Sequence, residues 1–338
     1  MYTESRLALS AMRIASFLFL RLSAKICVPI NLFKNQLGCR EHRKEGTLDS
    51  KTIEYPVIWL QCATCTGCLI SILNSVSPTI KNVLIDEVIP GKHVNLRFNA
   101  TVMAGAGDLA IAIAEETVRK VKGGYLLIVD GSIPTAKNGV YGSIGERNHQ
   151  PVSMVERVIE FSRDALAVMA VGTCATFGGI PAAAPNPTGC QGLKELLESK
   201  GIKTPVINVA GCPPHPDWFV GTVASLLLSG LPSADQLDDF GRPLTFYGKL
   251  IHENCQRRAY FDEGKFAKKH GDPGCLYELG CKGPLTYADC PTRLWNTGVN
   301  WCVGSGGGCH GCTQPEFPDL VSPLYVKTIE IETAPNKL

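Results

Sequence analysis

Two stretches, Tyr125-Leu-Leu-Ile-Val129 and Ala165-Leu-Ala-Val-Met-Ala-Val171, decide the fold. Both are apolar along their whole length, which is typical of strands buried on both faces of a parallel sheet. Shorter runs of the same kind predict strands at 56–60, 83–86 and 206–210. Helical patterns separate the runs, at 69–76, 108–121, 152–161, 193–199 and 218–228. This alternation predicts an α/β fold, with a flavodoxin-like, doubly wound parallel sheet over residues 55–230.

The alternation ends near residue 231. Residues 231–338 are rich in Gly, Pro and Cys, and their apolar runs are short. Such a segment buries little core by itself. Seven cysteines lie between Cys255 and Cys312, so we expect an irregular C-terminal domain that bound metal clusters hold in order.

The composition is that of an ordinary globular protein, with 338 residues, 45% of them hydrophobic and 19% charged. A formal net charge of +2 gives no argument for binding nucleic acid. The fifteen cysteines need an explanation. Disulfide frameworks suit smaller secreted chains, structural zinc needs closely spaced ligands, and free thiols are often plain core residues. Iron–sulfur clusters use sets of four thiolates, often in close pairs.

Four cysteines follow directly on predicted strands. Cys65 and Cys68 come after the strand 56–60, Cys174 after 165–171, and Cys212 after 206–210. Open α/β sheets bind ligands outside the carboxyl ends of their strands, so we expect these thiols to converge. Four thiolates match a [4Fe–4S] cluster. A catalytic dithiol at the Cys-x-x-Cys pair is the alternative.

Two further ligand sets follow in the C-terminal domain. The first combines His252, Cys255, Cys275 and Cys281, and the second combines Cys290, Cys302, Cys309 and Cys312. A neutral imidazole in place of a thiolate lowers the negative charge at a cluster and favours its reduction. Paired Cys-x-x-Cys ligands also suit a zinc ribbon. A zinc-stabilised, non-enzymatic interaction module therefore stays open as an alternative.

The other cysteines have no assigned partner. Cys62 extends the first loop to Cys-x2-Cys-x2-Cys, and we interpret it as a buried thiol, with a ligand role as the alternative. Cys27, Cys39 and Cys190 are treated as ordinary core or surface residues.

Taken together, these motifs resemble the small subunits of [NiFe] hydrogenases. The resemblance covers most of residues 55–325. It rests on Trp59-Leu-Gln, Cys65-Thr-Gly-Cys68, Gly172-Thr-Cys174, Gly178-Gly179, Gly211-Cys-Pro-Pro-His-Pro-Asp217, Ile251-His-Glu-Asn-Cys255, Gly280-Cys-Lys-Gly-Pro284, Asn300-Trp-Cys302 and Cys309-His-Gly-Cys312.

The resemblance implies a small subunit that carries electrons between a nickel–iron centre in a separate large subunit and an external acceptor. Hydrogen would be split in the partner chain, so this chain would hold no catalytic residue. The family places a proximal cluster on Cys65, Cys68, Cys174 and Cys212. It places the distal cluster on His252, Cys255, Cys275 and Cys281, and the medial cluster on Cys290, Cys309 and Cys312.

The medial site decides the cluster type. Many family members hold a [3Fe–4S] cluster there, with proline in place of a fourth ligand. This chain has Cys302, as the selenium-containing members do, so the resemblance implies three [4Fe–4S] clusters. Oxygen-tolerant members carry two extra cysteines, which would fall at Gly67 and near Gly179. Both are glycine here, so we expect an ordinary proximal cluster and sensitivity to oxygen.

The same resemblance suggests the partners. We expect a [NiFe] or [NiFeSe] large subunit and an acceptor such as a cytochrome or a membrane quinone-linked subunit, with no nucleic acid. An iron–sulfur subunit related to the quinone-reducing respiratory complex shares the proximal-type site. It lacks the C-terminal clusters, so residues 252–312 argue against that alternative.

Residues 1–50 are interpreted as an N-terminal extension or an export signal. The clean apolar run Ile14–Leu20 is too short to span a bilayer but fits the apolar part of an export signal. No adjacent Arg-Arg pair precedes it, so the twin-arginine signal of exported family members is not visible. We expect the periplasmic side of the cell membrane, with a cytoplasmic location as the alternative.

Overall fold

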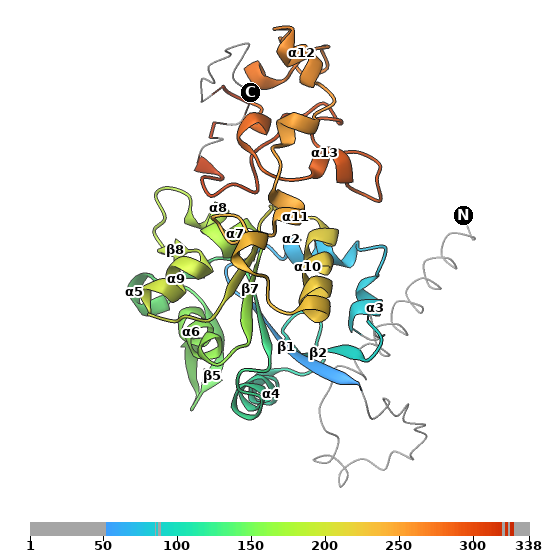
Figure 1. The fold of residues 1–338 in the computed structure, drawn as a ribbon. Coiled ribbons are helices and arrows are strands. Elements are labelled where there is room, and N and C mark those ends of the chain that lie inside the picture. The colour runs from blue at the N-terminus through green and yellow to red at the C-terminus, as the bar shows by residue number, and fades with distance from the viewer. Residues whose placement is uncertain (1–51, 85, 87–88, 320–321, 324, 328–338) are drawn as a thin grey trace, which may run out of the picture.

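The structure is a computed structural model that describes residues 52–84, 86, 89–319, 322–323 and 325–327. Its centre is a parallel five-stranded sheet (Figure 1). In spatial order the strands are β2 (Lys92–Asn99), β1 (Ile53–Gln61), β3 (Leu126–Asp130), β7 (Ala167–Val171) and β9 (Val206–Val209). This is the flavodoxin-like order, which confirms the predicted fold class.

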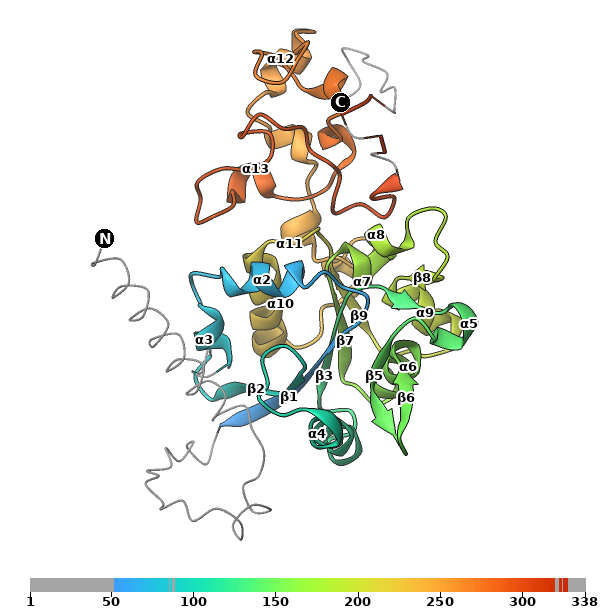
Figure 2. The ribbon, with the colours of Figure 1, turned by 180° about the vertical axis from the view of Figure 1, so that it is seen from behind.

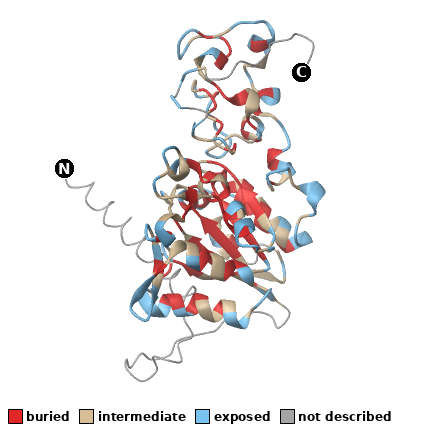
Figure 3. Ribbon diagram, turned by 90° about the vertical axis from the view of Figure 1, so that its left-hand side faces the viewer, coloured by how far each residue is buried: buried red, intermediate tan, exposed pale blue. Residues whose placement is uncertain are grey.

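Helices cover both faces of the sheet (Figure 2). On one face Val57, Trp59 and Ile128 pack against α2 (Gly67–Leu73), α3 (Ile80–Leu84) and α10 (Pro216–Ser229). On the other face the alternate strand residues, such as Ile58 and Leu127, pack against α4 (Gly107–Lys120), α6 (Met154–Arg163) and α9 (Leu193–Ser199). The strands are therefore buried on both sides, as their continuous apolar runs predict (Figure 3).

Shorter elements complete this α/β part. The helices are α5 (Ala136–Gly139), α7 (Thr173–Phe177) and α8 (Gly179–Ala182). Two small antiparallel sheets pair β4 (Ile133–Pro134) with β8 (Cys190–Gln191) and β5 (Ser143–Arg147) with β6 (Gln150–Ser153).

The prediction of a strand at 83–86 is wrong. Val83 lies in α3, which starts after Thr79, and the Asn82 side chain accepts a hydrogen bond from the Thr79 amide at 2.9 Å. This local bonding favours a helical turn over an extended chain. The sheet uses β2 instead, where Val94, Leu96 and Phe98 alternate with polar residues. Alternation of this kind is typical of an edge strand, whereas the prediction rests on continuous apolar runs.

The chain after α10 has short helical segments, and its described residues contain no named strand. The segments are η2 (Ala234–Gln236), α11 (Leu244–Tyr247), η3 (Ile251–Asn254), α12 (Arg258–Asp262), η4 (Tyr277–Leu279), η5 (Gly283–Leu285) and α13 (Cys290–Arg293). This irregular part sits above the carboxyl ends of the strands, next to α7 and α8 (Figure 1).

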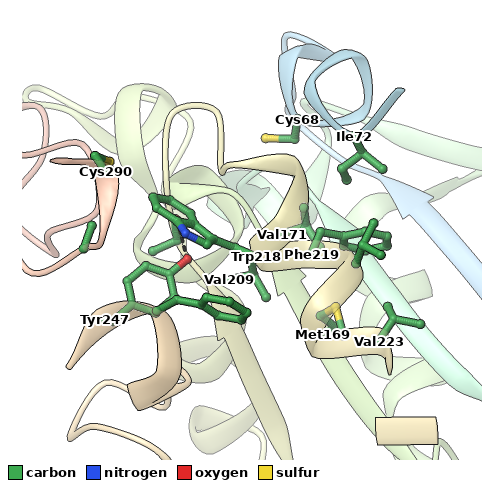
Figure 4. Close-up of a cluster of buried hydrophobic side chains, with 14 of the residues drawn as sticks. Cys68, Ile72, Met169, Val171, Val209, Trp218, Phe219, Val223, Tyr247 and Cys290 are labelled. Atoms are coloured by element: carbon green, nitrogen blue, oxygen red, sulfur yellow. Dashed lines mark hydrogen bonds between the residues drawn. The ribbon is translucent and has the colours of Figure 1, made fainter. Parts of the chain in front are cut away.

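Buried polar contacts join the two parts. The Tyr247 hydroxyl donates to the Ala210 carbonyl at 2.7 Å, and Trp218 Nε1 donates to Asp289 Oδ1 at 2.7 Å. The rings of Trp218 and Tyr247 pack together with centroids 5.2 Å apart, on the side of the core where Cys290 lies (Figure 4). Among the described residues, no helix combines the length and apolar character needed to cross a bilayer.

Candidate functional site

The first set of predicted ligands lies at one edge of the sheet. Cys65 and Cys68 follow β1, Cys174 lies in α7 directly after β7, and Cys212 follows β9. Parallel strands bring their carboxyl ends to the same edge, so these loops meet as the sequence predicts. Cys68 is buried, Cys174 and Cys212 are half-buried, and Cys65 is exposed.

Burial and neighbouring charges raise the pKa values of three of these thiols, Cys68, Cys174 and Cys212. Burial raises the pKa of Cys68, and Asp130, Cys174 and Cys212 raise it further by repulsion between negative charges. Burial also raises the pKa of Cys174 to about 12, with contributions from Cys212 and Cys65. Such repulsion acts only between nearby groups, so the thiols form one cluster of acidic groups. A bound cation would relieve this repulsion, because thiolates are the form that ligates metals.

Glycines let the loops pass close to the sulfur atoms. Gly172 has φ +87°, and a Cβ on it would lie 2.4 Å from Cys68 Sγ. Gly179 has φ +52°, and its Cβ would lie 2.9 Å from the Cys174 amide nitrogen. A side chain at either position would collide with a predicted ligand and strain the backbone.

The sequence interpretation missed Asp130 at this site. It ends β3, is fully buried, and accepts a hydrogen bond from the Thr64 hydroxyl at 3.1 Å. Burial raises its pKa to about 6, while hydrogen bonds from Thr64 and Cys68 oppose the rise. Its signal was available, because it is the polar residue at the end of the third predicted strand and therefore shares the edge with the cysteines.

The second set lies in the C-terminal part. Burial raises the pKa of Cys275, and charge repulsion from Cys281 and Cys255 adds to this effect. Burial likewise raises the pKa of Cys281, with a contribution from Cys255. His252 is buried beside Phe261, with ring centroids 4.5 Å apart. Burial, and then the charge of Arg258, lowers the pKa of His252 to about 4. The neutral imidazole is the form that binds metal, and its Nε2 has no hydrogen-bond partner among the described residues.

The third set is Cys290, Cys302, Cys309 and Cys312. Burial raises the pKa of Cys290, and repulsion from Cys312 and Cys302 adds to this effect. Burial also raises the pKa of Cys309, and the charges of Cys281, Cys312 and Cys290 add to this effect in that order. Cys302 is exposed to solvent, so it forms the open side of this set.

The three sets adjoin one another. Thr173, next to Cys174 of the first set, donates a hydrogen bond to the Cys312 carbonyl of the third set. Burial raises the pKa of Cys312, and charge repulsion from the nearby Cys212 thiol adds to this effect. The amide of Cys309, in the third set, donates to Cys281 Sγ in the second set at 3.2 Å. The order along the molecule is therefore first, third and second set, with one hydrogen bond at each step.

Backbone amides point at several of the sulfur atoms. The amide two residues after the cysteine donates to Cys65 at 3.4 Å, Cys255 at 3.4 Å, Cys281 at 3.5 Å and Cys309 at 3.4 Å. Hydrogen bonds of this kind favour the thiolate over the thiol. They also help to set the potential of a sulfur-ligated iron cluster. The donors present therefore fit iron–sulfur clusters.

The remaining cysteines lie apart from these sets or outside the description. Cys62 is buried, and its pKa is raised by burial and then by Asp130 and Cys190. Cys190 is also buried and accepts a hydrogen bond from the Thr188 hydroxyl at 3.2 Å. Cys27, Cys39 and the predicted export signal lie outside the described residues. Within the described ranges, no three His, Cys, Asp or Glu side chains are grouped so that they could hold a single metal ion.

Two family models match the chain. Residues 247–325 match the model for the C-terminal region of the NiFe/NiFeSe hydrogenase small subunit. Residues 65–226 match the NADH ubiquinone oxidoreductase 20 Kd subunit family. The second match covers the cysteines of the first set, and the first match covers the other two sets. The chain thus combines an N-terminal region with the first ligand set and a C-terminal region with the other two sets, as the sequence motifs indicate.

Whole-chain relatives agree with these matches. The periplasmic [NiFeSe] hydrogenase small subunit of Desulfomicrobium baculatum is 46% identical over 280 residues, which cover 80% of this chain and 87% of the relative. The quinone-reactive Ni/Fe-hydrogenase small chain of Wolinella succinogenes is 41% identical, with 80% and 73% covered. The solved [NiFeSe] hydrogenase of Desulfovibrio vulgaris Hildenborough superposes with a TM-score of 0.76 and 46% identity, covering 81% of this chain and 98% of that one.

Proposed function

The chain belongs to the family of NiFe and NiFeSe hydrogenase small subunits, and we propose that it relays electrons through three iron–sulfur clusters. Membership implies iron–sulfur clusters and a large-subunit partner within a hydrogenase complex. The observation that carries the finer proposal is the row of three adjoining donor sets, linked by the Thr173–Cys312 and Cys309–Cys281 hydrogen bonds. Membership in an electron-transferring family argues against the alternative of a zinc-stabilised interaction module.

The ligands are assigned set by set. The proximal cluster would bind Cys65, Cys68, Cys174 and Cys212, and the distal cluster His252, Cys255, Cys275 and Cys281. The medial cluster would bind Cys290, Cys302, Cys309 and Cys312. What supports the assignment is that Cys68, Cys275 and Cys290 each respond to the charges of other thiols of their own set. Cys281 and Cys309 also interact across the boundary between the second and third sets.

When bound, the clusters supply one-electron redox chemistry. The protein residues position the sulfur atoms, donate amide hydrogen bonds to them and keep water away from the buried ligands. Two sets offer four thiols, whereas the distal set replaces one thiolate with the neutral His252. The distal site is therefore less negative, which favours its reduction. With Cys302 as a fourth ligand, the medial site would hold [4Fe–4S], whereas a [3Fe–4S] cluster would leave Cys302 free.

The large subunit would dock around the exposed Cys65. Near it, α2 presents Ile70 and Leu73 to solvent, with 57% and 51% of their surfaces exposed. A groove of about 720 Å³ runs between α2, residues 213–217 and the loop 293–298. Exposed apolar side chains beside a groove are typical of a protein interface. Docking here would bring the proximal cluster close to the partner's active site.

The acceptor and the location follow from the relatives. One of them is named quinone-reactive, so a cytochrome or a membrane quinone-linked subunit remains our proposal for the acceptor. Another is named periplasmic, and we propose the periplasmic side of the membrane for this chain.

The test is to purify the hydrogenase complex anaerobically and measure iron, acid-labile sulfide and zinc. We expect about twelve irons per small subunit, with matching sulfide, from three four-iron clusters. About eleven would indicate a three-iron medial cluster. Stoichiometric zinc with little iron would overturn the relay. As a second test, the chain separated from its large subunit should not oxidise hydrogen.

A further inference from the structure

Thr173 lies where the proximal and medial sites meet. Its side chain is buried, with 1% of its surface exposed. The hydroxyl accepts a hydrogen bond from the Gly211 amide at 2.9 Å and donates one to the carbonyl oxygen of Cys312. A hydroxyl has a single hydrogen to donate, so this donor is fully used.

The residues joined by this hydroxyl belong to both sites. Thr173 precedes the proximal ligand Cys174, and Gly211 precedes the proximal ligand Cys212. Cys312 is a medial ligand. The Thr173 amide also donates to the Gly211 carbonyl at 2.9 Å, so the two proximal loops are fixed to each other. One side chain therefore ties two proximal loops to the backbone of a medial ligand.

Other contacts at this boundary act on neighbouring residues. Arg242 Nη1 donates to the Thr313 carbonyl at 2.7 Å, and Tyr247 donates to the Ala210 carbonyl. These bonds hold the C-terminal part near the strand ends. Thr173 differs from them because its hydroxyl bonds to a ligand residue itself.

We propose that Thr173 is a positioning residue that sets the separation between the proximal and medial clusters. This inference rests on the proposed function. Electron tunnelling slows steeply with distance, so a small shift of Cys312 away from Cys212 would slow the relay.

The test compares the whole anaerobic complex carrying Thr173→Val or Thr173→Ser with the wild type. Valine keeps the shape and removes the hydroxyl, whereas serine keeps the hydroxyl. Thr222→Val is the matched control, since Thr222 is a buried threonine whose hydroxyl bonds to Trp218 within α10. The readouts are iron content, the EPR splitting between neighbouring reduced clusters, and two rates. Hydrogen–deuterium exchange requires only the large-subunit centre, whereas reduction of a dye acceptor by H2 requires the relay.

For Thr173→Val we expect full iron content, a changed EPR splitting, unchanged isotope exchange and a loss of dye-reduction rate relative to the wild type. Thr173→Ser and Thr222→Val should match the wild type. A wild-type splitting in Thr173→Val, or the same loss in Thr173→Ser, would overturn the proposal. So would a loss of iron in Thr173→Val, because it would indicate a role in folding.

If Thr173→Val does not accumulate, Thr173→Ala removes the same hydroxyl with less bulk and is judged by the same criteria. The proposed function fails in a different way. A wild-type complex with stoichiometric zinc and little iron would contradict the three-cluster relay before any variant is compared.

Discussion

The α/β part and the C-terminal part hold their predicted ligands in opposite ways. In the α/β part, the ligands lie directly after the carboxyl ends of largely buried strands, above a core with two packed faces. In the C-terminal part, the helical segments have three to five residues. There, Cys275, Cys281, Cys290 and Cys309 are themselves among the buried side chains. The α/β part places its thiols through its backbone, whereas we expect the order of the C-terminal part to depend on what its thiols bind.

Removing the clusters should separate the two parts most strongly. After oxidation and chelation of iron, we expect proteolysis within residues 252–312 to become at least about tenfold faster, because metal binding there supplies folding free energy. Residues 53–229 should keep their helix and strand content. Limited proteolysis with mass spectrometry, together with circular dichroism, measures both. Equal loss of order in the two parts would contradict the comparison.

Gly172→Ala tests the opposite half, where the backbone places the thiols. The new Cβ would lie 2.4 Å from Cys68 Sγ on a residue with φ +87°. We expect a loss of about four irons per chain, the content of one cluster. Gly230→Ala is the matched control, because Gly230 has φ +81° but no atom within 4 Å of the added Cβ. If both variants keep their iron, the close packing at Cys68 is not needed to bind the cluster.

Cys302→Pro should have a smaller effect, confined to the medial site. Cys302 is exposed, so its removal costs little packing. We expect the medial cluster to lose one iron, to become a three-iron cluster, and to shift to a higher potential. A redox titration followed by EPR detects both changes. An unchanged spectrum would mean that Cys302 is not a ligand.

The sequence was sufficient where one rule acted locally. Continuous apolar runs located β1, β3, β7 and β9, and the strand-end rule then brought Cys65, Cys174 and Cys212 to one edge. The same rule failed at β2, because an edge strand alternates and Val83 instead joined a short helix. A short apolar run does not show whether the segment becomes a buried strand or the buried side of a short helix.

Tertiary contacts were beyond the sequence. The position of Asp130 at the end of β3 could have been predicted, but its hydrogen bond with Thr64 could not. The role of Thr173 could not be inferred, since its partner Cys312 is 139 positions away. Spacing grouped the second and third ligand sets, but it could not reveal that the Cys309 amide bonds to Cys281 of the other set. Of these contacts, only the Thr173–Cys312 bond requires the C-terminal part to pack on the strand ends.

His215 gives the smallest effect, at the boundary between the two parts. Its Nδ1 accepts from the Asp217 amide at 3.1 Å at the start of α10, and its Nε2 lies 2.9 Å from the Leu294 carbonyl. Both bonds suit the neutral ring, since a protonated Nδ1 cannot accept. Burial lowers the pKa of His215 below 6.5, with Asp217 opposing the change. Stability from this group is therefore present above pH 6.5 and is lost as the pH falls through the lowered pKa.

We expect the wild type to lose about 1 kcal/mol of unfolding free energy from this cap on going from pH 7.5 to pH 5.5. His215→Asn keeps a capping oxygen that does not titrate, so it should show a smaller loss over the same interval. Urea unfolding at both pH values measures the difference. An equal pH dependence in the two proteins would mean that other groups control the boundary. A smaller pH dependence in the variant would show that part of the contact between the α/β part and the C-terminal part depends on the neutral imidazole of His215.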